Sequence, residues 1–157
     1  MTEISKYYTP ELSEFYIGFE YEIKYGALLD FVQDTYSEDD FNEGKFRDGT
    51  EFRVKYLDVA DIERGGWTKT DNDIHFRNEV VLFGDKFKLF EYKKEHNIFY
   101  LEYLRDIYDG ALGLKVIISV WNTGTMSLSK NDKPQHLFNG NIKNISELKQ
   151  VIKMLSI

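Results

Sequence analysis

Two glutamates placed two residues apart are the leading candidates for chemistry in this sequence. Glu20 and Glu22 follow Gly18 in the stretch F-Y-I-G-F-E-Y-E, residues 15–22. Residues i and i+2 of an extended strand point to the same face, so the two carboxylates would lie about 7 Å apart. Oxygen ligands at that spacing could hold a hard cation such as Mg²⁺. The exposed face of an antiparallel strand carries the same pattern without a metal, and we favour that interpretation.

Two short patterns keep a metal-dependent enzyme as an alternative. Asp85 with Glu91-Tyr92-Lys93 resembles the acid and E-x-K pattern of metal-dependent nucleases, where carboxylates hold Mg²⁺ and the lysine assists the attacking water. The G-x-E-x-E segment resembles the opening strand of glutamate-cysteine-ligase-like amidoligases. That resemblance implies that Glu20 and Glu22 bind the metal of a nucleotide. Short patterns of common residues recur by chance, so both remain alternatives.

Other kinds of catalytic site have little support in the sequence. There is no cysteine, which excludes disulfides, thiolate metal sites and a cysteine nucleophile. The three histidines, His75, His96 and His136, have no zinc-binding spacing. The stretch R-G-G-W lacks the length and the lysine of a phosphate-binding loop.

The two glutamates belong to a predicted strand over residues 15–25. Apolar residues alternate there with Tyr16, Gly18, Glu20, Glu22 and Lys24, so one face is apolar and the other is polar.

A second strand with a basic face comes at residues 52–57. Arg53 and Lys55 alternate there with apolar residues, and Asp58 is placed to cap a short helix, with Asp61 three residues later. We expect Gly65 to end this helix in a left-handed conformation and Trp67 to fold back as an apolar anchor. If the two strands pair, the seam between them is the predicted binding site, formed by Glu20, Glu22, Arg53, Lys55, Arg64 and Trp67.

Further strands are predicted along the rest of the chain, ending in a helix. The expected strands are Ile74–Phe83, Phe87–Lys93, Asn97–Leu104, Leu114–Trp121, Met126–Ser129 and Leu137–Ile142. We expect a hairpin turn at Gly84-Asp85, and residues 97–109 could instead be helical. Leu114–Trp121 is the most apolar run, which predicts a central strand of a sheet. The last residues predict an amphipathic helix capped by Ser146.

The size and the charge of the chain limit the classes of protein to which it can belong. The 157 residues suit one domain over 1–157, with an exposed acidic insertion at 27–50 in which Ser37 could cap a helical turn. The net charge of −7 is concentrated early, since residues 1–50 hold 12 acidic and 4 basic residues. This balance disfavours direct nucleic-acid binding. No apolar run is long enough to cross a membrane.

Three separated segments resemble a known group of proteins. They are F-Y-I-G-F-E-Y-E (15–22), R-V-K-Y-L-D-V-A-D-I-E-R-G-G-W (53–67) and F-N-G-N-I-K-N-I-S-E-L-K (138–149). Together they resemble small proteins of phages and prophages of gut Bacteroidota. The resemblance implies an accessory gene of a mobile element that acts in the bacterial cytoplasm, and it carries no activity.

The sequence therefore predicts an α+β fold: a mainly antiparallel, twisted sheet or open barrel of about six strands, with a short internal helix and a C-terminal helix.

We expect a non-enzymatic binding protein without a cofactor, which engages a host protein such as a defence component or sequesters a small ligand such as a nucleotide. The alternatives are a metal-dependent enzyme using Glu20 and Glu22 and, more weakly, an acidic mimic of nucleic acid. Whether the chain forms a homo-oligomer stays open.

Overall fold

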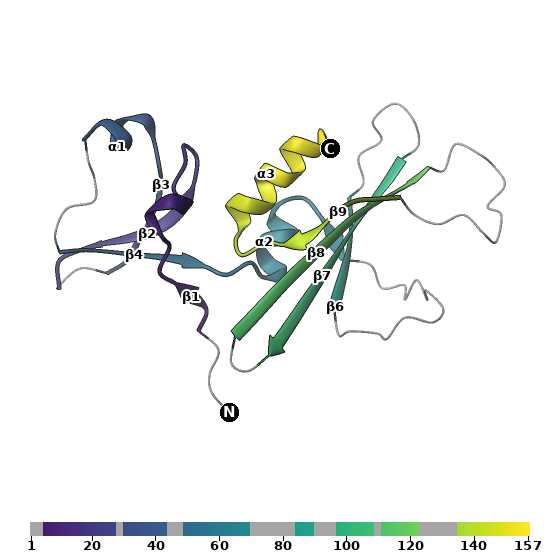
Figure 1. The fold of residues 1–157 in the computed structure, drawn as a ribbon, viewed down its shortest axis with the longest axis horizontal. Helices are drawn as coiled ribbons and strands as arrows, with labels where there is room; N and C mark the ends of the chain where they lie inside the picture. Colours follow the sequence, from purple (N-terminus) through teal and green to yellow (C-terminus); the bar gives the residue numbers. More distant parts are fainter. Residues whose placement is uncertain are drawn as a thin grey trace.

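The computed structural model has an α+β fold with two sheets. It describes residues 5–27, 30–43, 49–69, 84–89, 97–108, 111–122 and 135–157. Within these ranges the strands form one antiparallel sheet of four strands and another of five. The two sheets lie side by side, with two helices between them (Figure 1). The predicted antiparallel α+β class with a C-terminal helix is confirmed, but the strands form two sheets where we expected one.

The first sheet comes from the N-terminal third of the chain. Its strands lie in the order β1-β4-β2-β3 and are β1 (Tyr7–Tyr8), β2 (Glu20–Tyr25), β3 (Val32–Thr35) and β4 (Thr50–Lys55). A 3₁₀ turn, η1 (Leu12–Glu14), follows β1, and helix α1 (Glu38–Glu43) follows β3.

The second sheet carries the other two helices. Its strands lie in sequence order and are β5 (Thr68–Lys69), β6 (Gly84–Leu89), β7 (Asn97–Tyr108), β8 (Ala111–Asn122) and β9 (Gln135–Asn141). Helix α2 (Val59–Arg64) connects the two sheets in the sequence, and α3 (Ile145–Leu155) follows β9.

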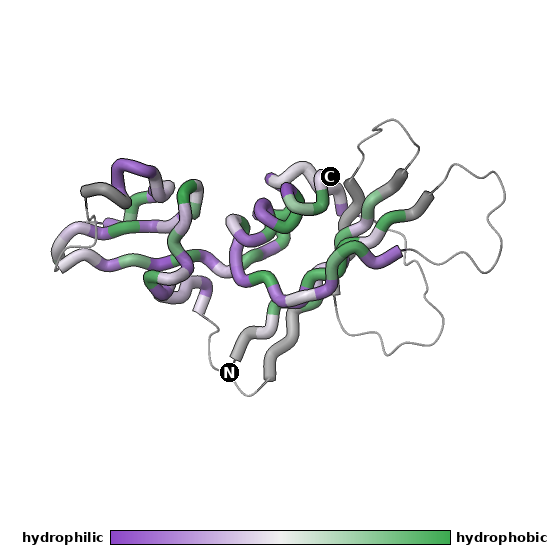
Figure 2. The backbone as a smooth tube through the Cα atoms, turned by 45° about the horizontal axis from the view of Figure 1, so that its top comes forward, coloured by the Kyte–Doolittle hydropathy of each residue, from purple (hydrophilic) through white to green (hydrophobic). Residues whose placement is uncertain are grey.

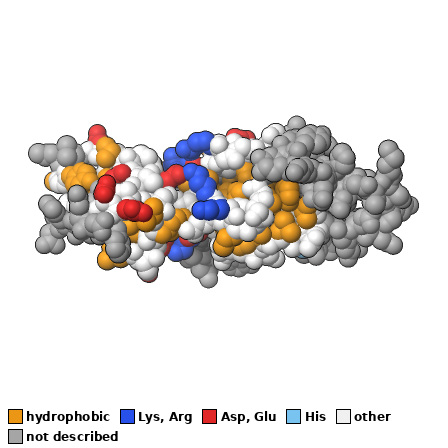
Figure 3. All heavy atoms as spheres, turned by 90° about the horizontal axis from the view of Figure 1, so that it is seen from above, with side chains coloured by type: hydrophobic (Ala, Val, Ile, Leu, Met, Phe, Trp, Pro, Cys, Tyr) orange, Lys and Arg blue, Asp and Glu red, His pale blue; other side chains and the backbone are white. Residues whose placement is uncertain are grey.

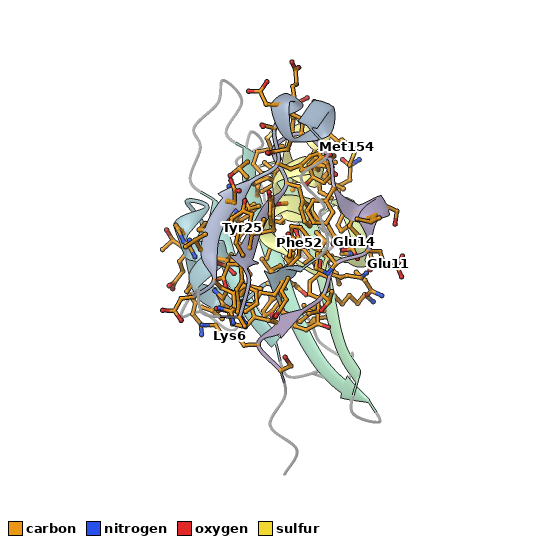
Figure 4. The ribbon with its side chains drawn as sticks, turned by 90° about the vertical axis from the view of Figure 1, so that its left-hand side faces the viewer. Lys6, Glu11, Glu14, Tyr25, Phe52 and Met154 are labelled. Carbon is orange, nitrogen blue, oxygen red and sulfur yellow. The ribbon has the colours of Figure 1, made fainter. Side chains whose placement is uncertain are left out.

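Each sheet has its own hydrophobic core. In the first, the buried side chains of Tyr21 and Ile23 on β2 and Val54 on β4 pack with Phe19 and Tyr36. The core is rich in aromatic rings, which bury a large area per residue. The side chain of Phe52 lies centrally among those of this half, whereas Glu11 and Lys6 lie at its periphery (Figure 4).

Strand β2 is shorter than the alternation of residues 15–25 predicted. It begins at Glu20, because the chain turns sharply at Gly18, whose φ of 93° favours glycine. Phe15 precedes this turn and still packs on the core, with its ring centroid 5.0 Å from that of Phe19 and 5.2 Å from that of Tyr21. Phe15 and Phe19 therefore share a face, as they would in a strand, although the backbone between them turns.

The segment that we predicted to be an exposed acidic insertion, residues 27–50, contributes to the first sheet. Residues Val32–Thr35 form β3, which pairs with β2, and Tyr36 is buried in the core. The predicted cap at Ser37 is confirmed, since its Oγ accepts a hydrogen bond from the Asp40 amide at 3.3 Å. The Asp40 carboxylate accepts one from the Ser37 amide at 2.9 Å. Part of the expected loop is thus regular structure.

The second core lies between the five-stranded sheet and the helices. Strands β7 and β8 each present alternate apolar residues to it, and α2 and α3 cover the same face (Figure 2). Its buried residues are Leu57, Ile62, Trp67, Leu101, Tyr103, Leu114, Val116, Ile118, Ile142, Leu148 and Val151. The anchoring role predicted for Trp67 is confirmed.

The structure decides several predictions for the second half. Residues 97–108 form a strand and not a helix, because all of them pair with β8. The turn predicted at Gly84-Asp85 is wrong, since both residues lie within β6 opposite Leu104 and Tyr103. A long partner strand overrides the local turn preference of that dipeptide. The predicted strands at 74–83 and 126–129 lie outside the described residues.

Two helix ends differ from prediction by one or two residues. Asp58 caps α2, as predicted, by accepting a hydrogen bond from the Asp61 amide at 3.0 Å. The left-handed residue after α2 is Gly66 (φ 92°) and not Gly65 (φ −71°). Helix α3 is capped by Asn144, whose side chain accepts from the amide of Glu147, and not by Ser146.

A polar network joins the two halves at Tyr8. Its hydroxyl donates to the Glu14 carboxylate at 2.8 Å and accepts from the amide side chain of Asn144, which is 1% exposed, at 2.9 Å. Burial and the bond to Glu14 raise the pKa of Tyr8, so its hydroxyl stays protonated and can donate. The Tyr8 ring also lies 4.8 Å from that of Tyr56, in the segment between β4 and α2.

Candidate functional site

Strands β2 and β4 place opposite charges next to each other on the face that points away from the first core. They pair in antiparallel register, which meets the condition on which the predicted seam depended, and Glu22 lies opposite Arg53 and Lys24 opposite Glu51. The carboxylate of Glu22 accepts a hydrogen bond from Arg53 Nε, and Lys24 Nζ lies 3.4 Å from the Glu51 carboxylate. We call this surface the charged face, which comprises Glu20, Glu22, Lys24, Glu51, Arg53 and Lys55.

The charges also specify the pairing of the two strands. A shift by two residues in one direction would place Glu22 opposite Glu51, and a shift in the other direction would place Lys24 opposite Arg53. Like charges directly opposite each other destabilise a sheet, whereas opposite charges stabilise it. In the observed register, Glu22 and Arg53 as well as Lys24 and Glu51 are directly opposed pairs of unlike charge.

Lys55 connects the charged face to helix α2. Its ammonium lies 2.7 Å from the Asp58 carboxylate and 3.0 Å from that of Asp61, whose side chain is only 5% exposed. Asp61 also accepts a hydrogen bond from Arg64. Burial lowers the pKa of Lys55, but the hydrogen bonds to the two aspartates outweigh it, so the pKa is raised and the lysine stays charged.

The cap of α2 should give a pH-dependent contribution to stability. Burial raises the pKa of Asp58, but hydrogen bonds from Lys55 and from the Asp61 amide outweigh it and hold the pKa below its usual value. The stabilisation is fully present above the unfolded-state pKa of about 3.9 and is lost as the pH falls through the lower folded-state pKa.

Asp58→Asn tests this, because asparagine caps a helix as well as aspartate does but does not titrate. In urea unfolding from about pH 6 to about pH 3, the stability difference between wild type and Asp58→Asn should shrink as the pH falls. A difference that stays constant over this range would contradict the assigned interaction.

Glu20 connects the charged face to α3. Its carboxylate accepts a hydrogen bond from Lys149, and its backbone amide donates to Ser146 Oγ at 2.9 Å. Ser146, which lies in the first turn of α3 and not at its cap, thereby joins the first sheet to α3. Sequence analysis missed Lys149, which lies 129 positions from Glu20.

Arg53 is held between two aromatic rings. The central carbon of its guanidinium lies 4.0 Å from the centroid of the Tyr7 ring and 4.0 Å from that of the Phe31 ring. Tyr7 comes from β1, and Phe31 immediately precedes β3, so edge segments on both sides of the sheet contribute. These contacts are short for cation–π pairs, which extend to about 6 Å. With Glu22 on Nε, they fix the position of the guanidinium.

A groove of about 220 Å³ opens beside the charged face. The residues lining it come from β2, β3, β4, α2 and α3 and are Glu20, Tyr21, Glu22, Gln33, Thr35, Val54, Lys55, Asp61, Arg64 and Ile145. The exposure of its charged residues varies widely: the Arg64 side chain is 73% exposed, whereas that of Asp61 is 5% exposed. Lysine and arginine atoms gather near the middle of the molecule, between its two halves (Figure 3).

Five of the six predicted binding residues come together here, and the sixth does not. Glu20, Glu22, Lys55 and Arg64 line the groove, and Arg53 lies next to it on the same face. Trp67 is 2% exposed and belongs to the second core. The contributions of Tyr7, Phe31 and Asp61 to this surface were not predicted. Phe31 falls in the segment predicted to be an insertion, Asp61 was assigned to the helix cap, and no role was assigned to Tyr7.

The acidic side chains that line the groove form ion pairs. Glu20, Glu22 and Asp61 each contact a lysine or arginine, so the two glutamates proposed as metal ligands are already neutralised by cations. Among the described residues no group of three or more acidic or histidine side chains could hold a metal ion. Of the second metal-binding pattern, Asp85 lies within β6, and Glu91 and Lys93 lie outside the described ranges.

Outside this face, one histidine has a polar side-chain partner within the described ranges. His136 Nδ1 lies 2.9 Å from Ser119 Oγ, across the pairing of β9 with β8. His75 and His96 lie outside the described residues.

Comparison with known proteins adds no relative. No protein-family model, curated protein or solved structure matches the chain. None of the described helices combines the length and the apolar character needed to cross a bilayer.

Proposed function

We propose that this chain is a non-catalytic binding protein that engages another protein through the charged face and its groove. The observation that carries the proposal is the pairing of the acids in the groove with cations from three different elements, β4, α2 and α3. A general base or a metal ligand needs a carboxylate that is available to the substrate or ion. A recognition surface instead needs fixed charges of both signs, and paired charges provide these.

The size of the groove favours a protein partner over a sequestered nucleotide. Pockets that enclose small ligands usually measure about 300–1,000 Å³, and this groove measures about 220 Å³. Bases usually stack on accessible aromatic rings. The aromatic residue lining this groove is Tyr21, which is 1% exposed and belongs to the first core. One or two side chains of a protein partner would fit the groove.

The biological setting of the proposal comes from the sequence resemblance alone. An accessory protein of a phage or prophage would meet its partner in the bacterial cytoplasm. A host protein, such as a component of a defence system, is therefore the class of partner that we propose.

Exchanging the charges of one ion pair tests the proposal. The double variant Glu22→Arg/Arg53→Glu keeps an ion pair across β2 and β4 and the net charge of the chain, but it reverses the pattern on the surface. We expect the wild-type chain, used as bait in an extract of its native host, to retain a partner that the double variant loses. Because the exchange removes the cation–π contacts of Arg53 with Tyr7 and Phe31, the two baits are compared at a temperature at which circular dichroism shows that both are folded.

Lys115→Glu is the matched control, because Lys115 is exposed on β8 of the second sheet. It should retain the partner. A partner that binds the double variant as well as the wild type would show that the charged face is not the contact, and recovery of no partner by the wild type would contradict the binding function itself.

A further inference from the structure

We propose that Arg53 recognises a carboxylate of the partner protein, which it binds through the two terminal nitrogens of its guanidinium. This inference rests on the proposed binding function and specifies its chemistry.

The N–H groups on the two terminal nitrogens of Arg53 are available to bind a carboxylate. Its Nε donates to Glu22, and among the residues that the structure describes no acceptor bonds to the two terminal nitrogens. Together these nitrogens carry four N–H groups at the end of the side chain, which is 33% exposed. Two parallel N–H groups on a planar guanidinium match the two oxygens of a carboxylate.

The fixed position of the guanidinium is the second argument. The rings of Tyr7 and Phe31 both lie against it, each with its centroid 4.0 Å from the central carbon, and Glu22 accepts a hydrogen bond from its Nε. The edge that bears the terminal nitrogens is therefore the part left for a ligand. Because the side chain is already ordered, little conformational entropy is lost when it binds. Tyrosine and arginine are also enriched among residues that dominate binding energy at interfaces.

Arg64 lacks this arrangement. Its side chain is 73% exposed, and it donates to Asp61, a carboxylate that also accepts from Lys55. No aromatic ring is recorded against its guanidinium in the described part of the chain.

The charge around Arg53 favours a carboxylate over a phosphate group. The charged face holds three acids and three bases, and Glu22 directly contacts Arg53. A carboxylate brings one negative charge close to Glu22, whereas a phosphate monoester brings about 1.5 to 2. The repulsion from Glu22 is therefore smaller for an aspartate, a glutamate or a C-terminal carboxylate.

Arginine side-chain NMR on the whole protein tests the inference without the partner. The probes are acetyl-glutamate amide, the uncharged acetyl-glutamine amide and inorganic phosphate. We expect the Arg53 guanidinium signals to shift saturably with the glutamate probe and not with the glutamine probe. We expect phosphate to bind no more tightly than glutamate.

Arg53→Lys and Arg105→Lys form the matched pair of variants, because each keeps its positive charge and loses the planar fork, and Arg105 lies on β7 of the second sheet, outside the charged face and its groove. We expect binding of the glutamate probe, followed by backbone amide shifts, to weaken about tenfold or more in Arg53→Lys and to stay unchanged in Arg105→Lys. Absence of a saturable shift in the wild type, or equal weakening in both variants, would overturn the role of Arg53. Phosphate binding tenfold tighter than glutamate would overturn the choice of carboxylate.

The outcomes also separate this inference from the proposed function. If the glutamate probe fails but the partner is still lost from Glu22→Arg/Arg53→Glu, the carboxylate inference is wrong and the binding function stands. If the probe binds but the wild-type chain captures no partner, the proposed function is the part that is wrong.

Discussion

Replacing Trp67 with alanine should lower the free energy of unfolding by about 3–5 kcal/mol, the usual cost of removing a large aromatic side chain from a core. Trp67 is 2% exposed and packs in the second core with Ile62 of α2 and Leu101 of β7. Its removal leaves a cavity between α2 and the sheet, so α2 loses its main anchor. The loss can be measured by urea unfolding of the purified variant.

Trp67→Phe is the control, because a smaller ring fills part of the same space. It should lose clearly less stability than Trp67→Ala. A loss below about 0.5 kcal/mol for the alanine variant, the usual range of surface substitutions, would contradict the buried position. It would also restore Trp67 as a candidate for the binding seam, in which we placed it in addition to its predicted role as an apolar anchor.

Replacing Asn144 with alanine should cost about 2–4 kcal/mol. The substitution removes the cap of α3, worth about 1 kcal/mol, and also the buried hydrogen bond to the Tyr8 hydroxyl, worth about 1–3 kcal/mol. Because Asn144 is 1% exposed, water cannot replace the lost donor without rearrangement. Thermal or urea unfolding would give the value.

A double-mutant cycle isolates the contact between the two halves. Tyr8→Phe removes the same hydrogen bond from the other side while leaving the cap of α3 in place. The cost of Asn144→Ala should therefore be smaller in the Tyr8→Phe background than in the wild type. Strictly additive costs would show that the Tyr8–Asn144 contact does not hold the two halves together.

Local sequence patterns predicted the parts of the fold that depend on neighbouring residues. The basic strand at 52–57 pairs with the acidic strand that contains Glu20 and Glu22, and the opposite charges of the two strands were visible in the sequence. The cap at Asp58 follows from residue type and spacing. The alternation of apolar residues wrongly placed Phe15 in the strand. The chain turns at the left-handed Gly18, and this turn brings the Phe15 side chain back to the face of the sheet that carries the core.

The site was only half predictable because its other half comes from distant residues. Lys149 reaches Glu20 across 129 positions, and Phe31 reaches Arg53 from a segment that looks like a loop. Ser146 and Asn144 are both good capping residues, but Asn144 caps α3, and Ser146 lies within its first turn and accepts from the Glu20 amide. No local pattern contains this information.

Hydroxyl-radical footprinting of the complex with the captured partner tests the charged face most directly. Tyr7 and Phe31 are partly buried rings next to Arg53, whereas Met154 is 74% exposed on α3 and Leu12 is 70% exposed in η1. The account predicts that the partner slows oxidation of Tyr7 and Phe31 and leaves Met154 and Leu12 unchanged. Unchanged oxidation of both rings in a saturated complex would contradict it.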